Sequence, residues 1–529
     1  MKKILVAILI FGGLFAGLAW GLEVYSEKKI TQLLNNNPDR KYDILFEEIS
    51  ISLFKQVASL KKIRLVPLDE EVATKVSGSL NSIELNGVGF LDLFFNRRLT
   101  INRLVLNDPG FRLIHKEVNS RPEDNSQALQ GLFQDVISRG VISNFELRNG
   151  TAEFLVQGDS LMPFGNFTDL NISAYGIISD SVIVQNLVPF QLESIRISLK
   201  NLKLNTLDKQ LFKFGELDFD SESKTILIKD LSLKYDDWEE FVNQMEYQKD
   251  VIEFSLKELT LSYIDTKNNI YGDWQIIAGL ARLDGMVLED YRDKNKPRPE
   301  EPEKPLFEGM VEQIPFPIEL DTIRISNAEI IYRELLPGNA EPGLLKFDQV
   351  SAEVLNFTSS DSLQVGEMTL HASALFNGVA KMNLDFQVPY GKELFTLQAS
   401  IQGFELSGIN EILERMASVR VASGKVREML LEMEVSRYRS SNRLTFQYED
   451  LKLELLGEDH SKKKLKSAVA NLFSSKSNLS TDSNYKKAIY VTDRNIYRGP
   501  FNLIWESTKE GLLQIVPGDV VQLFGPKKK

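Results

Sequence analysis

The side chains that could carry out chemistry are few in this sequence and lie far apart. There is no cysteine, which excludes thiolate nucleophiles, cysteine-bound metals and disulfides. The three histidines, His115, His371 and His460, do not fall at any metal-binding spacing. His115 ends an alternating apolar–polar stretch and His371 lies within one, so both are predicted to be strand-surface residues.

Two short stretches match ligand-binding motifs only in part. Asp218, Asp220 and Glu222 suggest a calcium loop, but its central glycine and distal glutamate are missing, which favours an exposed strand face. The glycine pair in residues 87–89 is half of a dinucleotide fingerprint and is typical of a turn. No serine-hydrolase, zinc-protease or P-loop pattern is present. We therefore predict that the chain is not an enzyme and has no cofactor and no metal site.

The charge of the chain bears on its partners. With 62 basic and 74 acidic residues in 529, the formal net charge is −12. Nucleic acid is not expected as a partner, because phosphate binding needs a basic surface. The charge is unevenly distributed: residues 458–529 contain thirteen Lys and Arg against seven Asp and Glu, so they carry +6 and the rest of the chain carries −18.

The first element of the chain is an apolar run over residues 4–22 that contains no charge. Its nineteen residues are close to the ~20 that a helix needs to cross ~30 Å of hydrocarbon. Lys2 and Lys3 precede it, which predicts a cytoplasmic N-terminus and places everything after Glu23 outside. A cleaved signal peptide is the alternative, although its apolar part is usually about 7–15 residues long. We favour a retained, single-pass transmembrane helix in residues 1–22.

Beyond residue 40 the dominant pattern is alternation of apolar and polar residues with period two. This pattern is typical of antiparallel strands with one dry face and one wet face, so we predict a mainly β fold. The dry face is represented by nine residues in three segments, which are Ile195, Ile197, Leu199, Met382, Leu384, Phe386, Leu451, Leu453 and Leu455.

One hairpin-sized unit recurs along the chain. Residues 104–114, 145–156 and 323–332 each contain a strand pattern, then Asn beside Asp, Gly or Ala, then a second strand pattern. That chemistry is typical of a tight β-hairpin. Repetition of the unit predicts a sheet that grows lengthwise, with each strand contacting mainly its neighbours.

Helical patterns interrupt the strands. Apolar residues fall on one side of residues 126–139, 236–247, 408–416, 461–473 and 500–516. Residues 293–305 are charged and rich in proline, so they cannot pair in a sheet; a loop within one sheet is favoured over a linker between two bodies. The predicted organisation is an anchor (1–22), an N-terminal β part (23–292), a charged segment (293–317), a second β part (318–457) and a basic segment with amphipathic helices (458–529).

A sheet with one apolar face must cover that face. A second sheet would give a sandwich with a solid core, which is the more common outcome from composition alone. A sheet that curls lengthwise into a trough would instead hold lipid chains on its apolar lining. Both arrangements need the same alternation, so the pattern by itself leaves them open.

Both ends of the sequence contain segments in a recognisable order. An apolar helix is followed by strand patterns at residues 49–53 and 80–85, and then by residues 98–111 with their Asp-Pro-Gly turn. Near the C-terminus come residues 403–406, 422–425 and 448–452, and then the helical patterns of 463–473 and 494–505. This order resembles the AsmA-like family of envelope proteins, of the AsmA and TamB type, whereas the middle of the chain matches only in strand pattern.

The resemblance implies an elongated, curled antiparallel sheet, called a β-groove, anchored in the inner membrane of a diderm bacterium with its bulk in the periplasm. It implies phospholipid transfer between inner and outer membranes and a part in envelope biogenesis. The acyl chains would lie in the groove, on the nine lining residues named above, of which Ile195 is the first and Leu455 the last. The basic C-terminal helices are expected either to contact the outer membrane or an envelope partner protein, or to pack back onto the end of the sheet as a cap. The alternative is a non-transporting scaffold for outer-membrane protein assembly.

Overall fold

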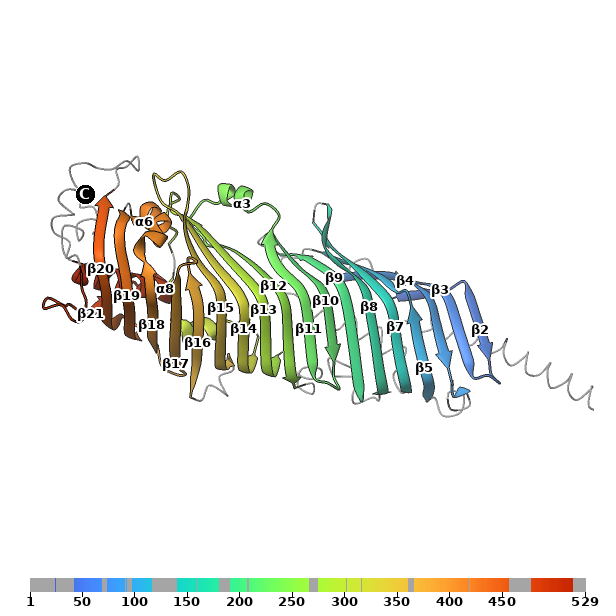
Figure 1. Ribbon diagram of the computed structural model, residues 1–529. Coiled ribbons are helices and arrows are strands. Elements are labelled where there is room, and N and C mark those ends of the chain that lie inside the picture. The colour runs from blue at the N-terminus through green and yellow to red at the C-terminus, as the bar shows by residue number, and fades with distance from the viewer. Residues whose placement is uncertain are drawn as a thin grey trace, which may run out of the picture. The chain divides into compact units, whose positions relative to one another are not determined.

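The computed structural model describes residues 24, 42–68, 74–90, 92, 98–116, 140–158, 160–179, 191–206, 209–265, 275–300, 302–314, 316–359, 366–417, 419–455 and 477–516. Strands dominate these residues, as the alternation predicts: they account for 67% of the structure, number 21 and belong to one large mixed sheet, with few short helices (Figure 1). The mainly β fold is therefore confirmed.

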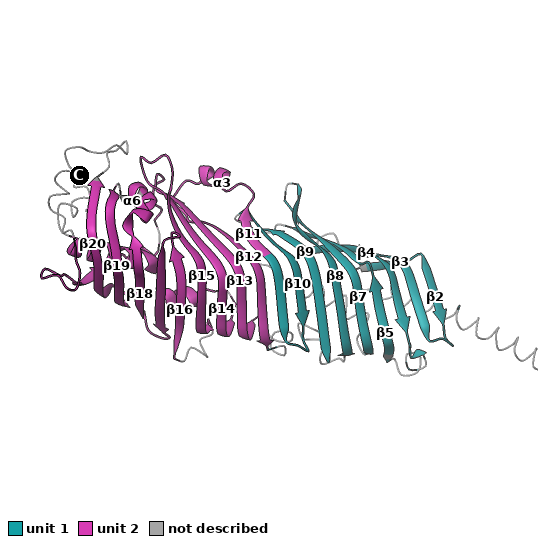
Figure 2. Ribbon diagram, viewed as in Figure 1, with its two compact units in different colours: residues 1–230, 265–273 teal, residues 231–264, 274–529 magenta. Residues whose placement is uncertain are grey.

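The chain divides into two compact units, which are coloured in Figure 2. Unit 1 comprises Met1–Asp230 and Asp265–Asp273, and unit 2 comprises Leu231–Ile264 and Trp274–Lys529. The boundary falls within strand β11 (Thr225–Tyr235). The other described strands of unit 1 are β1 (Tyr42–Leu45), β2 (Glu48–Ser52), β3 (Val57–Pro67), β4 (Thr74–Asn86), β5 (Leu99–Asn107), β6 (Gly110–Lys116), β7 (Gly140–Gln157), β8 (Leu161–Ser179), β9 (Ser194–Asn205) and β10 (Gln210–Asp220).

Most strands of unit 1 pair with their sequence neighbours in antiparallel register, from β3 with β4 to β9 with β10. Strands β5 and β6 are the exception. They lie end to end between β4 and β7, antiparallel to β4 and parallel to β7. The sheet is therefore mixed, and the prediction of a wholly antiparallel sheet is too simple. Parallel neighbours need a long crossover connection, which short-range alternation does not reveal.

Unit 2 contains β12 to β21 and the described helices, which are α3, α5, the 3₁₀ helix η4, α6 and α8. Consecutive strands pair in antiparallel register except β13 and β14, which are parallel. The charged segment predicted at 293–317 joins those two parallel strands. The bounds are β12 (Val251–Ile264), β13 (Ile276–Asp293), β14 (Ile318–Leu335), β15 (Gly343–Thr358), β16 (Glu367–Phe376), β17 (Ala380–Pro389), β18 (Leu394–Glu405), β19 (Val419–Ser436), β20 (Arg439–Leu455), β21 (Ala488–Asp493), α3 (Trp238–Gln244), α5 (Phe307–Glu312), η4 (Leu406–Ile409), α6 (Asn410–Ala417) and α8 (Pro500–Ile515).

Three of the five predicted helices fall within the described residues, and all three form. The pattern at 236–247 becomes α3, where the side chain of Asp237 accepts a hydrogen bond from the Glu240 amide as an N-cap. The pattern at 408–416 becomes η4 and α6, and that at 500–516 becomes α8, with Pro500 in its first turn. The helices predicted at 126–139 and 461–473 lie outside the described residues.

The predicted transmembrane segment, residues 4–22, also lies outside the described residues. Within the part of the chain that the structure does describe, no helix has both the length and the apolar character needed to cross a membrane.

The predicted hairpins are wrong, and the structure shows why. Residues 145–156 lie within the single strand β7, and 323–332 lie within β14. At the expected turns, Asp108, Asn149 and Asn327 have positive φ angles of 51°, 56° and 52°. The register shifts beside Asn149 and Asn327 mark β-bulges, each of which adds one residue and bends the strand. Asn and Asp tolerate this left-handed backbone, so the same residues suit a hairpin turn and a bulge.

The bulges of neighbouring strands are connected. In unit 1 the Asp108 carboxylate accepts hydrogen bonds from the Asn81 and Asn149 side chains, at 3.3 and 3.0 Å. The backbone N–H of Asn149 donates a hydrogen bond to the side-chain oxygen of Asn171 on β8, at 3.1 Å. In unit 2 the Asn327 side chain donates to Asp284 of β13, at 2.7 Å. Each unit therefore has a line of bulges across adjacent strands, which bends its part of the sheet along that line.

A bulge also shifts the phase of the apolar pattern. In β9 the apolar positions are 195, 197 and 199 before the bulge at Asn201 and 202 and 204 after it. Burial indicates that the face is the same on both sides of the bulge, because Leu199 and Leu202 are half-buried whereas Lys200 and Lys203 are exposed. Leu199 lies opposite Leu217 of β10, and Leu202 lies opposite Phe214. The extra residue therefore keeps the apolar side chains on one face while the strand bends.

Candidate functional site

The apolar face of unit 1 includes three of the residues predicted to line a groove. Ile195, Ile197 and Leu199 alternate along β9, and Ile197 lies opposite Ile172 of β8 and Phe219 of β10. All of these side chains are half-buried. Of the three predicted residues, Ile195 also packs against a small buried cluster, formed by Ile101, Ile142, Ala174 and Ile177.

The strands at the start of unit 2 carry an apolar face of the same kind. Leu288 of β13 lies between Phe254 of β12 and Ile330 of β14, and Ile330 lies opposite Phe347 of β15. The four side chains form a row across these strands, and each is half-buried. Helix α3 does not cover this row.

Helix α3 meets β13 on the other side of the sheet. The ring of Trp238 packs on that of Tyr291, with centroids 5.0 Å apart. Tyr291 is an odd-numbered residue of β13, so its side chain points away from the face that carries Leu288. Helix α3 therefore packs on the face of the sheet opposite the row around Leu288.

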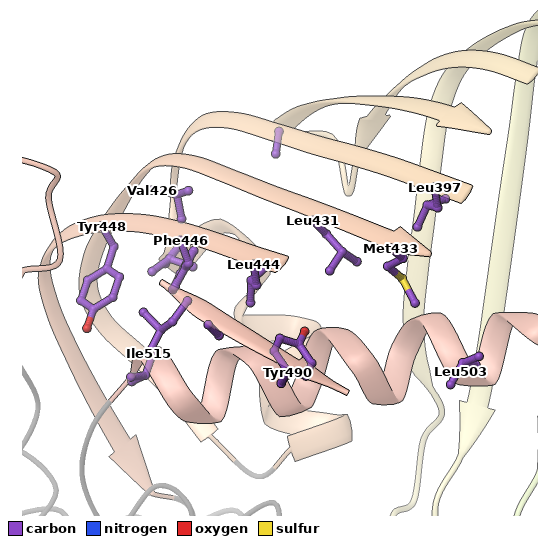
Figure 3. Close-up of a cluster of buried hydrophobic side chains, with 14 of the residues drawn as sticks. Leu397, Val426, Leu431, Met433, Leu444, Phe446, Tyr448, Tyr490, Leu503 and Ile515 are labelled. Atoms are coloured by element: carbon purple, nitrogen blue, oxygen red, sulfur yellow. The ribbon is translucent and has the colours of Figure 1, made fainter. Parts of the chain in front are cut away.

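The C-terminal part of unit 2 is filled. Phe395, Val426, Leu444 and Tyr448 are completely buried in one large core. Figure 3 shows the reason: side chains of β18, β19 and β20 point toward β21 and α8, which lie across this face of the sheet. Leu503 and Ile515 of α8 belong to the same core, at 3% and 1% exposure. Here the apolar face is covered by the chain itself.

Specific contacts hold α8 close to the strands. The hydroxyls of Ser440 on β20 and Ser507 on α8 form a buried hydrogen bond of 3.0 Å. The Tyr490 hydroxyl of β21 donates to the Ser507 carbonyl oxygen at 2.5 Å. A Cβ atom at Gly511 would lie 2.3 Å from the Tyr490 Oη and 2.7 Å from Leu444 Cδ2, so a glycine is required for this approach.

The remaining predicted lining residues lie at or near this core. Phe386 is buried, with its ring stacked 4.9 Å from that of Phe395, and Leu384 packs against the same cluster. Met382 is half-buried on the same face of β17. Leu451 and Leu453 are buried within the core, whereas the side chain of Leu455 lies outside the described residues. The nine residues therefore do not form one lining: some are half-buried and others are packed.

Polar side chains follow the apolar row on the same face of β13 and β14. Asp290 and Arg292 continue the positions of Leu288, and register places them opposite Tyr332 and Glu334. The Tyr332 hydroxyl donates to the Glu334 carboxylate at 2.6 Å. Burial raises the pKa of Tyr332, and hydrogen bonding to Glu334 raises it further. This group was not predicted from the sequence, although strict alternation after Leu288 and Ile330 places all four residues on the dry face.

The described candidate residues for catalysis or metal binding are half-buried or exposed, on strands β6, β10 and β16 and in the turn after β10. His371 is exposed on β16, as predicted, with its Nδ1 atom 2.6 Å from the Asp385 carboxylate. Arg196 pairs with Asp220 and Glu222, at 3.0 and 2.8 Å. Among the described residues, no group of three or more acidic or histidine side chains is arranged to hold a metal ion. His460 lies outside the described residues.

Comparison with known proteins adds no assignment. The chain matches no family model and no curated protein. The resemblance to AsmA-like proteins therefore stays a prediction from the sequence.

Proposed function

We propose that this protein holds phospholipid acyl chains on the half-buried apolar face of its sheet and takes part in phospholipid transfer between the inner and outer membranes. In this proposal the N-terminal segment anchors the chain in the inner membrane, the β body is periplasmic, and envelope biogenesis depends on the transfer. The observation that carries the proposal is the row formed by Phe254, Leu288, Ile330 and Phe347, which is half-buried on the face opposite helix α3.

The physical argument concerns the cost of moving acyl chains through water. Each methylene that leaves an apolar environment costs about 0.8 kcal/mol, so a two-chain lipid does not cross water unaided. Half-buried apolar side chains on adjacent strands offer a surface on which successive methylenes stay in contact with hydrocarbon. The bulge lines bend this surface, and a bent sheet contacts a flexible chain over more of its circumference than a flat sheet does.

Site-specific photocrosslinking in the full-length chain tests the proposal. A photoreactive amino acid at Ile197 or Ile330, on the half-buried face, is expected to form covalent adducts with phospholipid that mass spectrometry detects. The matched controls are Ser198, on the opposite face of β9, and Leu431, which is 2% exposed in the packed core. Adducts at neither half-buried position, or equal adducts at Ser198, would contradict lipid binding on this face.

One observation favours the alternative of a scaffold for outer-membrane protein assembly. Strand β21 pairs with β20 on one side, and in the described residues no strand pairs with its other side. Ile489 and Val491 on β21 are 74% and 52% exposed. An exposed edge with β-branched side chains can accept an added strand from another protein. Under this alternative, aspartate at Ile197 and Leu199 would leave function intact, whereas proline at Val491 would abolish it.

A further inference from the structure

The polar group beyond the apolar row is built around one carboxyl group. Asp290 of β13 lies opposite Ile252 of β12 and Tyr332 of β14, one step along the face from Leu288. Its Oδ1 atom is buried and has no hydrogen-bond partner among the described residues. A buried polar atom without a partner is costly, so such an atom at the end of the half-buried row points to a ligand group that would supply the missing hydrogen bond.

The cations near Asp290 are already engaged. Arg292 donates from Nε and Nη2 to the two carboxylate oxygens of Asp250, each at 2.5 Å. Lys294 pairs with Glu334 at 2.8 Å, and Glu334 is only 6% exposed. Two acids are therefore balanced by two bases, and Asp290 is the additional acid. A hydrogen-bond donor with positive charge is the ligand group that such a site takes.

We propose that Asp290 binds the primary ammonium of a phosphoethanolamine headgroup while the acyl chains of the same lipid lie on the row around Leu288. This inference rests on the proposed function and names its substrate class, an amine-bearing zwitterionic phospholipid. The position fits the chemistry, because the headgroup and tails of one lipid need a polar and an apolar surface side by side. The Tyr332 hydroxyl and the Glu334 carboxylate lie on the same side of Asp290 and supply further polar contacts.

The site is expected to depend on pH. Burial, and then the charge of Asp250, raises the pKa of Asp290 to about 7, while Arg292 opposes the shift and Glu334 adds to it. Only the deprotonated carboxylate forms a charge-assisted hydrogen bond with an ammonium group, which stays protonated in this range as a lysine amine does. Binding of the headgroup should therefore strengthen as the pH rises from 6 to 8.

The test uses full-length protein, stripped of lipid in detergent and then exposed to vesicles of equal phosphatidylethanolamine and phosphatidylglycerol. We expect the lipid recovered with the protein at pH 8 to be enriched in phosphatidylethanolamine roughly tenfold, since a charge-assisted hydrogen bond is worth at least one decade in affinity. Asp290→Asn should return the ratio to about one while total lipid per chain is unchanged. Glu289→Gln, on the opposite face of β13, is the matched control and should keep the enrichment.

The possible results separate the two proposals. Wild-type headgroup preference in Asp290→Asn, with lipid still bound, would overturn the ammonium site and leave the lipid face intact. Wild-type protein that recovers no lipid at all would overturn both. Soluble phosphoethanolamine that binds as well as the lipid would show a site for a free amine and overturn the lipid assignment. If Asp290→Asn does not fold, the wild-type pH series decides, because enrichment that is equal at pH 6 and pH 8 contradicts the role of Asp290.

Discussion

Two regions of unit 2 carry the same sequence pattern but have different interiors. In β12 to β15 the row that contains Phe254 and Leu288 is half-buried, although Leu256 on the same face of β12 is buried. In β17 to β21 the same kind of face is buried under α8, and residues such as Phe395 are inaccessible. The difference does not come from the strands. It comes from a helix that follows β20 by more than forty residues and folds back over it.

The comparison shows what decides whether a sheet of this type is open or filled. Alternation supplies an apolar face everywhere, and that face is closed only where another element of the chain covers it. In unit 2 the cover is α8 together with α5, whose Phe307 ring packs on those of Phe386 and Phe395 at 4.8 and 5.1 Å. The filled region stabilises its end of the sheet, and the half-buried row is where the proposed function places the acyl chains.

The largest expected difference between the regions is in the cost of removing an aromatic ring. Phe395→Ala should lower the free energy of unfolding by about 3–5 kcal/mol, because it leaves a cavity in a packed core. Phe254→Ala should cost only about 1–2 kcal/mol, because its ring is partly in solvent already. Urea unfolding of lipid-free protein, followed by tryptophan fluorescence, measures both. Equal losses would mean that the face around Phe254 is as well filled as the core.

A second prediction concerns the seating of α8. Alanine at Gly511 gains about 1 kcal/mol in helix propensity, but its Cβ overlaps the Tyr490 hydroxyl, so we expect a net loss of about 1–3 kcal/mol. Tyr490→Phe removes the overlapping oxygen and also the hydrogen bond to Ser507. The double variant should lose less stability than the two single variants lose when their losses are added. A double-mutant cycle measures this difference. Strict additivity would show that α8 does not pack against Tyr490 in this way.

Much of the fold follows from local pattern, and the errors have physical causes. Periodicity predicts features that depend on residues close together in the sequence. These features are the mainly β fold, the dry face and helices α3, α6 and α8. The hairpins were wrong because Asn149 and Asn327 suit both a turn and a bulge. The informative signal was the change of phase, from Ile195, Ile197 and Leu199 to even-numbered positions without a reversal of the chain.

Whether the apolar face is covered was harder to predict than which residues lie on it. Periodicity correctly predicts that Leu451 and Leu453 lie on the apolar face, but it does not predict which part of the chain covers that face. The cover depends on contacts distant in sequence, such as the hydrogen bond between Ser440 and Ser507. Asp290 was missed for a different reason: it lies in phase with Leu288, but a charged residue gives no sign in the sequence that it is partly buried on the apolar face.

The smallest expected effect concerns the bends of the open region. Asn327 in β14 has a positive φ and its side chain donates to Asp284, whereas Asn383 in β17 is an exposed strand residue without a positive φ. Asn327→Ala should therefore cost about 1 kcal/mol, because alanine tolerates the left-handed region less well and the hydrogen bond is lost. Asn383→Ala should stay within about 0.5 kcal/mol. Asn327→Gly should fall between them, since glycine accepts the backbone but not the hydrogen bond. Thermal unfolding of the three variants measures the order, and an Asn327→Ala variant as stable as Asn383→Ala would show that the bulge does not need its left-handed residue.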